Sequence, residues 1–343
     1  MSQSSHILVI RLSAMGDVAM TVPVLRALTE TYPHVKITVL TKKTFKPFFK
    51  DLINVEVFEA EIRGRHKGVF GLWRLAKELK SLNLDAVADL HNVLRSNVLR
   101  FFFFFYGVKF VQIDKGRQEK KALVNGHKFQ QLKSTHERYA DVFRKLGYRI
   151  DLSNPKFPER KILDSEISEY IGKDTRQWIG IAPFAAFQGK MYPIDLMEQV
   201  IDHLAIANKV ILFGAGNDEK KVLDKLSKNK RGVLNVAGRF SLDQELDIIS
   251  NLDLMVAMDS ANAHLAAMMG IRVLTLWGVT HPYAGFYPFN QNLENALLAD
   301  RKQFPQIPTS VYGKKLPDGY EKSMRTISPN AVVSKAKQIL GNI

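Results

Sequence analysis

The segment at residues 7–17, Ile-Leu-Val-Ile-Arg-Leu-Ser-Ala-Met-Gly-Asp, decides the fold class of this chain. Residues 7–11 form an apolar run with β-branched side chains, which predicts a short buried strand. A loop with a glycine follows at 12–17, and residues 18–31 then carry apolar side chains at helical spacing: Val18, Val22, Leu25 and Leu28. The order strand, loop, helix is typical of α/β domains built on parallel sheets.

The same unit recurs along the whole chain. Further strands are predicted at 36–40, 55–58, 86–89, 109–113, 178–182, 210–213, 234–236, 254–257 and 273–276. Helices fit between them, for example at 193–206, 218–227, 242–251 and 262–269. Residues 151–161 hold two prolines without a regular period and are interpreted as a linker. We therefore expect two similar α/β domains in tandem, followed by a last helix at 328–340 that begins at Ser328-Pro329.

Length and composition exclude several classes of protein. The chain has 343 residues, of which 46% are hydrophobic and 24% charged, as in ordinary globular proteins. Cysteine is absent, which excludes disulfides, cysteine-bound zinc and iron–sulfur clusters and fits a reducing, cytoplasmic location. No secretory signal and no apolar run of about 18 residues is present, so no spanning helix is expected.

Positive charge is concentrated in the first part of the chain. Residues 1–160 hold 28 Lys and Arg against 15 Asp and Glu, a net charge of +13, whereas residues 161–343 hold 21 against 19, a net charge of +2. Such an asymmetry suggests that one domain binds a polyanion. Surface charge that only keeps the protein in solution is the alternative interpretation. Nucleic acid, an anionic membrane surface and a phosphorylated substrate are the three candidates.

Four loops that follow predicted strands are candidates for chemistry, because ligands of open parallel sheets bind beyond the carboxyl ends of the strands. In the first, Asp17 fits either a helix cap or a general base. In the second, Lys190 precedes a helix start and fits either a surface lysine or a phosphate ligand. The third is the glycine-containing turn at 213–219. The fourth, at 258–267, combines Asp259, Ser260, Asn262 and His264 with small residues, and we interpret it as a site.

Three of these segments together resemble a known family. Residues 7–23, with Arg11-Leu12-Ser13-Ala14-Met15-Gly16-Asp17 and Pro23, resemble the opening of the ADP-heptose:lipopolysaccharide heptosyltransferases, glycosyltransferase family nine. Lys190-Met191-Tyr192-Pro193 is similar to that family's Lys-x-Trp-Pro pattern. Residues 259–270, followed by Leu276-Trp277-Gly278-Val279-Thr280-His281-Pro282, resemble its donor-site segment.

The resemblance implies an α/β fold of the GT-B architecture, with two Rossmann-like domains facing across a cleft. It implies an acceptor-binding domain at 1–160, a nucleotide-sugar donor domain at 161–327, and a C-terminal helix at 328–343 that packs back on the first domain. The implied reaction is an inverting transfer of heptose from ADP-heptose to a lipopolysaccharide core acceptor. Neither a metal ion nor another cofactor is expected, since no Asp-x-Asp pair is present.

The resemblance also assigns roles to residues. Asp17 is the expected base and Lys190 the cation that stabilises the departing ADP. Donor binding is assigned to Gly214, Glu219, Asp259, Ser260, Ala261, Asn262, His264 and Thr280. Acceptor binding is assigned to Ser13, Met15, Gly16, Arg63, Arg65, His66, Lys67, Arg117 and Lys120, because a lipopolysaccharide precursor is anionic and lies at the inner-membrane surface. A peripheral position on the inner face of that membrane follows as an expectation.

Two interpretations remain open for the run of five phenylalanines at 101–105. It fits a patch that touches a membrane, or a helix that buries some of its rings in the core. The second interpretation is favoured, because five consecutive residues point all around a helix.

Rival functions remain as well. A UDP-sugar 2-epimerase, or a transferase with another donor, can share this architecture. A non-catalytic polyanion-binding protein and a paralogue that binds donor without turnover are further alternatives. Nucleic acid is not the expected partner, because aromatic residues are not interleaved with the basic runs as a stacking surface requires.

Overall fold

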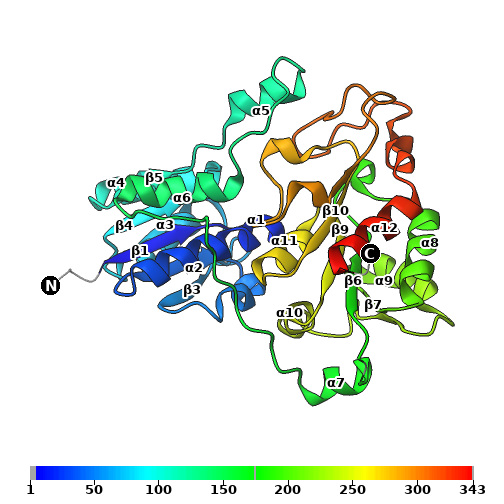
Figure 1. Cartoon of the computed structure of the whole chain (residues 1–343). Helices are drawn as coiled ribbons and strands as arrows, with labels where there is room; N and C mark the ends of the chain where they lie inside the picture. Colours follow the sequence, from blue (N-terminus) through cyan, green and yellow to red (C-terminus); the bar gives the residue numbers. More distant parts are fainter. Residues whose placement is uncertain (1–4, 174, 342–343) are drawn as a thin grey trace. The chain divides into compact units, whose positions relative to one another are not determined.

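The protein consists of two α/β units (Figure 1), described by a computed structural model that covers residues 5–173 and 175–341. The first unit comprises residues 5–115 and Thr135–Lys156. The second comprises Gly116–Ser134 and residues 157–341. The expectation of two parallel-sheet α/β domains is confirmed, and each unit is described by itself below.

The first unit is built on a five-stranded sheet in the order β3-β2-β1-β4-β5. All neighbouring strands pair in parallel. Its strands are β1 (His6–Ile10), β2 (Lys36–Thr41), β3 (Val55–Glu59), β4 (Ala86–Asp89) and β5 (Lys109–Gln112). The central strands are apolar over nearly their whole length, as expected for parallel strands with helices on both faces.

Helices cover both faces of this sheet. One face is covered by α3 (Gly68–Lys80) and α4 (Leu94–Phe105), which pack on each other and on Leu8, Ile10 and Val87. The opposite face carries α2 (Thr21–Thr31) and α6 (Thr135–Leu146). The short α1 (Met15–Ala19) follows β1, and a 3₁₀ helix lies at Lys43–Phe49. This arrangement makes the crevice between β1 and β4 the point where the strand order reverses, the usual ligand position.

The second unit has a six-stranded parallel sheet in the order β11-β10-β9-β6-β7-β8. The strands are β6 (Trp178–Ala182), β7 (Lys209–Leu212), β8 (Val233–Asn235), β9 (Leu254–Met258), β10 (Val273–Trp277) and β11 (Ala296–Leu298). The helices are α5 (Arg117–Val124), α7 (Ser165–Ile171), α8 (Ile194–Ala205), α9 (Gly216–Ser227), α10 (Leu242–Ser250), α11 (Ala261–Met268) and α12 (Pro329–Leu340). Short 3₁₀ helices lie at Gln188–Lys190, Pro282–Ala284, Leu293–Asn295 and Tyr320–Thr326.

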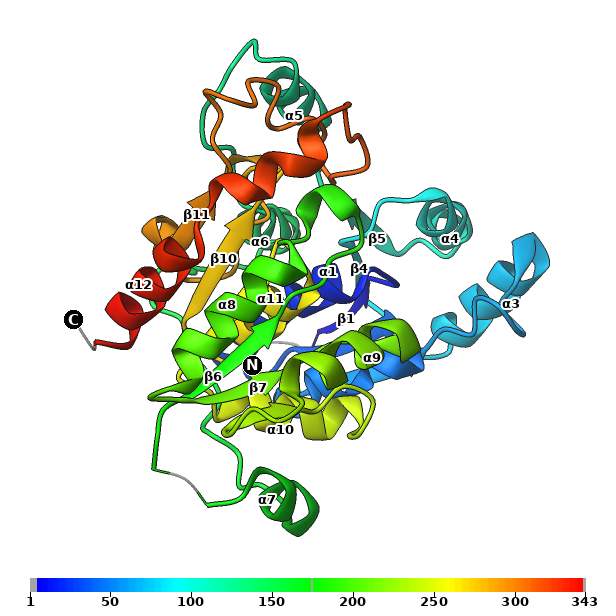
Figure 2. The same ribbon diagram turned by 90° about the vertical axis from the view of Figure 1, so that its right-hand side faces the viewer.

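The C-terminal helix differs from expectation. We expected it to pack back on the first domain, but α12 lies on the second sheet beside α8 (Figure 2). Val332, Val333, Ala336 and Leu340 join the hydrophobic core that α8, α9 and the strands of the second unit form. Their spacing of i, i+1, i+4 and i+8 places one apolar stripe on this core, and that stripe determines where the helix packs.

Residues 116–134 also differ from the predicted boundary, which placed all of 1–160 in one domain. Leu123 and Leu132 pack with Ala284 and the rings of Phe129, Tyr283 and Phe286. The Leu132 amide donates to the Tyr283 carbonyl at 3.0 Å. These contacts group α5 and its loop with the second unit.

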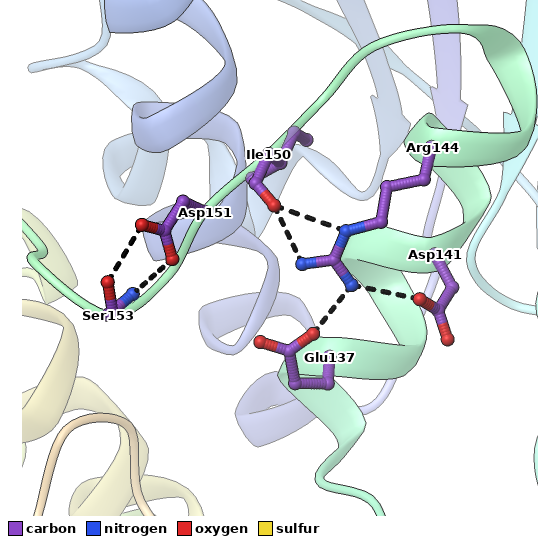
Figure 3. Close-up of polar contacts among 6 residues, drawn as sticks. All are labelled: Glu137, Asp141, Arg144, Ile150, Asp151 and Ser153. Atoms are coloured by element: carbon purple, nitrogen blue, oxygen red, sulfur yellow. Dashed lines mark hydrogen bonds and ion pairs between the residues drawn. The ribbon is translucent and has the colours of Figure 1, made fainter.

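Arg144, near the end of α6, fixes the segment that leads out of the first unit (Figure 3). Its guanidinium donates to the Ile150 carbonyl at 2.7 and 3.1 Å, and to Glu137 and Asp141 at 2.6 and 2.9 Å. Just beyond, the Asp151 carboxylate accepts from the Ser153 amide and hydroxyl. The Arg144 bonds hold Ile150 against α6, and the Asp151–Ser153 bonds shape the turn that follows before the chain enters the second unit.

The strands predicted from sequence are all present, each within one or two residues. The helices α5, α6 and α7 and the strand β11 were not predicted. Among the described residues, no helix is long and apolar enough to cross a membrane.

Replacing a buried ring of α4 tests the packing of the first unit. Phe103 is fully buried, so Phe103→Ala is expected to lower the free energy of unfolding by about 3–5 kcal/mol. The neighbouring Phe104 is 76% exposed, so Phe104→Ala is the matched control and should change it by less than about 0.5 kcal/mol. Urea denaturation of both variants measures this difference, and equal losses would contradict the described orientation of α4.

Candidate functional site

In the first unit, the loop after β1 holds Asp17 beside a buried arginine. Arg11 Nη2 lies 2.7 Å from Asp17 Oδ2, and Arg11 Nη1 donates to the Leu90 carbonyl at 2.7 Å. The Ala14 amide donates to the same Oδ2 at 3.2 Å. Asp17 is therefore both a cap for the start of α1 and one half of an ion pair. Arg11 links it to the end of β4, across the reversal point of the sheet.

The other residues of this loop surround Asp17. Ser13, Met15 and Gly16 are half-buried, and the Ser13–Ala14 peptide bond is cis. The Tyr139 hydroxyl of α6 lies 3.4 Å from the Asp17 carbonyl, so α6 supports the loop from one face of the sheet. The carboxylate side chain itself is about one quarter exposed, at 27%, which leaves it accessible to a ligand.

His91 is a residue of this site that the sequence reasoning missed. It follows β4 as Arg11 follows β1, and its side chain is buried, with Nδ1 making no hydrogen bond within the described chain. Asp89 shapes the loop by accepting from the His91 and Asn92 amides at 2.9 Å. Burial, and then the charge of Arg11, lower the pKa of His91 to about 3, so the ring is neutral. Its position after a central strand was the available signal.

The predicted acceptor cations after β3 have unequal environments. Arg63 and Lys67 are exposed, whereas Arg65 pairs with Glu61 at 3.0 Å and with Glu78 at 3.4 Å. His66 is buried, with Nδ1 accepting from the Glu61 amide and Nε2 lying 3.2 Å from Glu78. Its ring nitrogens are thus engaged in holding this turn.

The remaining two acceptor candidates lie on α5 and belong to the second unit. Arg117 is exposed at the first position of the helix. Lys120 is buried, with its ammonium 4.0 Å from the centre of the Phe286 ring. We had expected both in the first domain, and the apolar contacts of Leu123 and Leu132 explain the difference.

In the second unit, the centre of the site is an ion pair between two strand-end loops. Lys190 Nζ, after β6, lies 2.9 Å from Asp259 Oδ2, after β9. The Thr280 hydroxyl, after β10, donates to the same oxygen at 2.8 Å. The Lys190 and Asp259 side chains are only 12% and 11% exposed. Three loops from three neighbouring strands thus converge on one carboxylate oxygen.

Close backbone packing fixes the path of the Lys190 side chain. A Cβ on Gly313, where φ is +79°, would lie 2.6 Å from Cδ of Lys190. Gly278 is similarly constrained, because a Cβ there would lie 2.2 Å from the Gly189 carbonyl oxygen. The Val279 amide donates to that carbonyl at 3.0 Å. Glycines at these places let the loops approach closely enough to set the lysine beside Asp259.

The start of α11 lies next to this ion pair. Ser260 is the N-cap residue, yet its hydroxyl is buried and makes no hydrogen bond within the described chain. Ala261 and Asn262 in the first turn are half-buried, and His264 is buried. A helix start with a lysine beside it and a hydroxyl not used as a cap can receive an anion.

The turn after β7 carries the last two donor candidates. Glu219 Oε2 accepts from the Ala215 amide at 2.7 Å. A Cβ on Gly214 would lie 3.1 Å from the same oxygen, so this glycine lets the carboxylate fold over the turn. Glu219 thus caps the backbone at the start of α9 in this structure. Among the described residues, no group of three or more His, Asp or Glu side chains could hold a metal ion.

Solved structures of glycosyltransferases share the fold of this chain. The crystal structure of a family 9 glycosyltransferase from Veillonella parvula is similar, with a TM-score of 0.77, 19% identity and coverage of 99% of this chain and 98% of that one. The E. coli heptosyltransferase WaaC with ADP gives a TM-score of 0.70 at 19% identity, covering 97% of this chain and 99% of that one. The chain thus has the fold of this class of transferases.

Sequence comparison assigns this chain to a family of glycosyltransferases. The sequence profile of glycosyltransferase family 9 (heptosyltransferase) matches residues 72–315. The chain belongs to this family. The lipopolysaccharide core heptosyltransferase OpsX of Haemophilus influenzae is 25% identical over 303 residues, which are 84% of this chain and 83% of that protein. The predicted family is confirmed, and the protein is a transferase.

The buried His91 predicts a loss of stability in acid. In the folded protein its pKa is about 3, against an ordinary value of 6.5, so only the unfolded chain binds a proton between these values. Stability is therefore full above pH 6.5 and falls as the pH drops toward 3. Between about pH 7 and about pH 4.5, His91 should account for a loss of about 2 kcal/mol.

His91→Gln removes the titrating group. Urea unfolding at both pH values should show a smaller acid-induced loss in this variant than in the wild type. His203→Gln, at an exposed position on α8, is the matched control and should keep the wild-type loss. An equal loss in the wild type and in His91→Gln would refute the assignment.

Proposed function

We propose that the protein transfers heptose from ADP-heptose to a lipopolysaccharide core acceptor, with inversion and without a metal ion. The single observation that carries the proposal is the Lys190–Asp259–Thr280 cluster beside the start of α11. A diphosphate needs a cation and free hydrogen-bond donors, and this cluster offers both. Family membership supports heptose as the sugar.

Two names among the relatives support the particular substrates. The structure of WaaC was solved with ADP, which favours adenosine diphosphate as the donor nucleotide. The name of OpsX specifies lipopolysaccharide core as the acceptor of that relative. The exposed Arg63 and Lys67 suit the negative charge of such an acceptor. We also propose that the protein is cytoplasmic and binds this acceptor at the inner face of the membrane.

In the proposed reaction, Asp17 is the base that receives the proton of the acceptor hydroxyl. The contacts that hold this carboxylate, from Arg11 and the Ala14 amide, engage Oδ2. Its Oδ1 is therefore the oxygen that takes the proton. As the acceptor oxygen forms its bond to the anomeric carbon, the bond from that carbon to the diphosphate breaks on the opposite face. One such displacement inverts the configuration.

The second unit stabilises the leaving group in this mechanism. The Lys190 ammonium has three donors, of which one faces Asp259, so others are available for diphosphate oxygens. The Ser260 hydroxyl and the first amides of α11 supply further donors. Asp259, which also accepts from the Thr280 hydroxyl, orients the lysine, and the proposed mechanism assigns no step to a metal ion.

Nucleotide binding tests the donor site through Gly313. ADP should raise the melting temperature of the wild type by several degrees without added metal, since a ligand at ~100 times its Kd stabilises by ~2.7 kcal/mol. Gly313→Ala should weaken ADP binding about tenfold, because the new methyl displaces Lys190. UDP and GDP should have smaller effects than ADP, and Mg²⁺ should not increase the ADP effect.

Gly319→Ala is the matched control. Gly319 has a φ of +83°, close to that of Gly313, but a Cβ there meets no atom within 4 Å. Both variants therefore place an alanine at a similar positive φ, and only Gly313→Ala should lose ADP affinity. A larger shift in melting temperature with UDP or GDP than with ADP would exclude ADP-heptose as the donor.

Asp17→Asn tests the base. The amide is close in shape but cannot accept the proton, so transfer from ADP-heptose should fall by about a hundredfold or more. The ADP-induced thermal shift should stay unchanged, because Asp17 belongs to the first unit and the donor cluster to the second. Full transfer activity in Asp17→Asn would exclude Asp17 as the base.

A further inference from the structure

The helix α4 has an apolar face that no part of its own unit covers. Ser96, Leu99 and Phe103 point into the core and are fully buried. On the opposite side, Leu94, Phe101 and Phe105 are 80%, 60% and 67% exposed. Their spacing of i, i+7 and i+11 brings them into one stripe along the helix axis. An amphipathic helix would carry polar residues there.

The exposed rings form a continuous ridge. The centres of the Phe101 and Phe105 rings lie 5.0 Å apart, and those of Phe104 and Phe105 lie 5.6 Å apart. Phe104 adds its own exposed surface beside them. A cluster of large exposed aromatic side chains indicates a surface that meets an apolar partner.

Positive charge flanks this ridge on both sides. At 100° per residue, Arg95 lies about 100° to one side of the Leu94 direction and Arg100 about 120° to the other. Both are exposed, and α4 contains no acidic residue. The adjoining α3 adds the exposed Arg74, Lys77 and Lys80. An apolar ridge between cations matches a bilayer surface, where rings enter the acyl boundary and cations meet anionic headgroups.

We propose that this α4 surface, defined by Leu94, Phe101, Phe104 and Phe105 with Arg95 and Arg100, docks on an anionic phospholipid bilayer. The helix has 12 residues, too few to span a membrane, so it lies in the plane of the interface. A second copy of the chain is a poorer occupant. A two-fold interface through this face would bring two cation-flanked surfaces together, and α4 has no acidic residue to offset that charge.

The proposal deepens the proposed function, on which it rests for the need to reach a membrane-bound acceptor. Residues 63–67, which carry the predicted acceptor cations, lead directly into α3, and α3 packs on α4. Exposed Val69 and Phe70 begin α3 at that junction. Docking through α4 would therefore bring the acceptor-binding turn toward the lipid surface within a single unit.

Vesicle sedimentation of the full chain tests the surface. The wild type should bind vesicles of phosphatidylcholine with phosphatidylglycerol, bind phosphatidylcholine alone weakly, and lose binding as salt is raised. The triple variant Phe101→Ser, Phe104→Ser, Phe105→Ser should bind the anionic vesicles about tenfold less or weaker. Arg95→Glu with Arg100→Glu should lose the preference for anionic lipid.

Matched controls use exposed residues elsewhere. Ile53→Ser with Ile206→Ser removes two exposed apolar side chains, and Lys221→Glu with Lys225→Glu reverses two exposed charges on α9. Both controls should bind vesicles like the wild type. Thermal melting should be unchanged in all variants, because each altered side chain is exposed.

Tryptophan fluorescence reports directly whether α4 contacts the lipid. Phe104→Trp should give fluorescence that shifts to the blue with anionic vesicles and is quenched by brominated lipid, whereas Ile206→Trp should give neither signal. Absence of wild-type binding to anionic vesicles would overturn the proposal, as would undiminished binding by the triple Phe variant. A concentration-dependent dimer that the triple variant abolishes, without vesicle binding, would instead assign the surface to a second copy.

Transfer assays separate this proposal from the proposed function. With a deacylated, water-soluble acceptor, the α4 variants should retain wild-type transfer. If the chain transferred no heptose at all, vesicle binding would still report on α4. If transfer occurred but no vesicle bound, only the docking surface would be refuted.

Discussion

Parallel strand pairing is the constraint on which the rest of this structure depends. Every strand of both sheets runs in the same direction as its neighbours, so each connection must cross over a face of the sheet and every strand ends at the same edge. Arg11 and His91 meet at that edge in the first unit, and Lys190, Asp259 and Thr280 in the second. Strand direction alone thus brings together polar side chains that are far apart in the chain.

The ion pairs at these edges orient the side chains that we propose as catalytic. Arg11 keeps the Asp17 carboxylate on the reversal point of the first sheet, and Asp259 keeps the Lys190 ammonium beside α11. Each catalytic candidate is therefore oriented by a partner of opposite charge before substrate arrives. Such preorganisation lowers the cost of ordering charged side chains during the reaction.

Local sequence patterns predict most strands and strand-end loops of this structure. The features that they do not predict depend on packing between segments far apart in the chain. Apolar runs and their spacing predicted the strands, and the loop after each strand predicted the Lys190 and Asp259 positions. Sequence order could not show which core a segment joins, so α5 and α12 were assigned to the wrong unit. The phenylalanine run shows the same limit: residue spacing predicted that its rings point in all directions, but only packing shows that Phe103 is buried and Phe104 exposed.

The membership of residues 116–134 has a consequence for dissecting this enzyme. The chain passes between the two units three times, at 115–116, at 134–135 and at 156–157, rather than once. A fragment cut at the single proline-rich linker would keep α5 but lose the apolar partners of Leu123 and Leu132. A chimera that exchanged one half with a relative at that linker would likewise mismatch this contact. An autonomous first unit requires residue 115 to be rejoined to residue 135, and a chimera of this chain keeps the contacts of Leu123 and Leu132 only if its junctions move α5 together with the second unit.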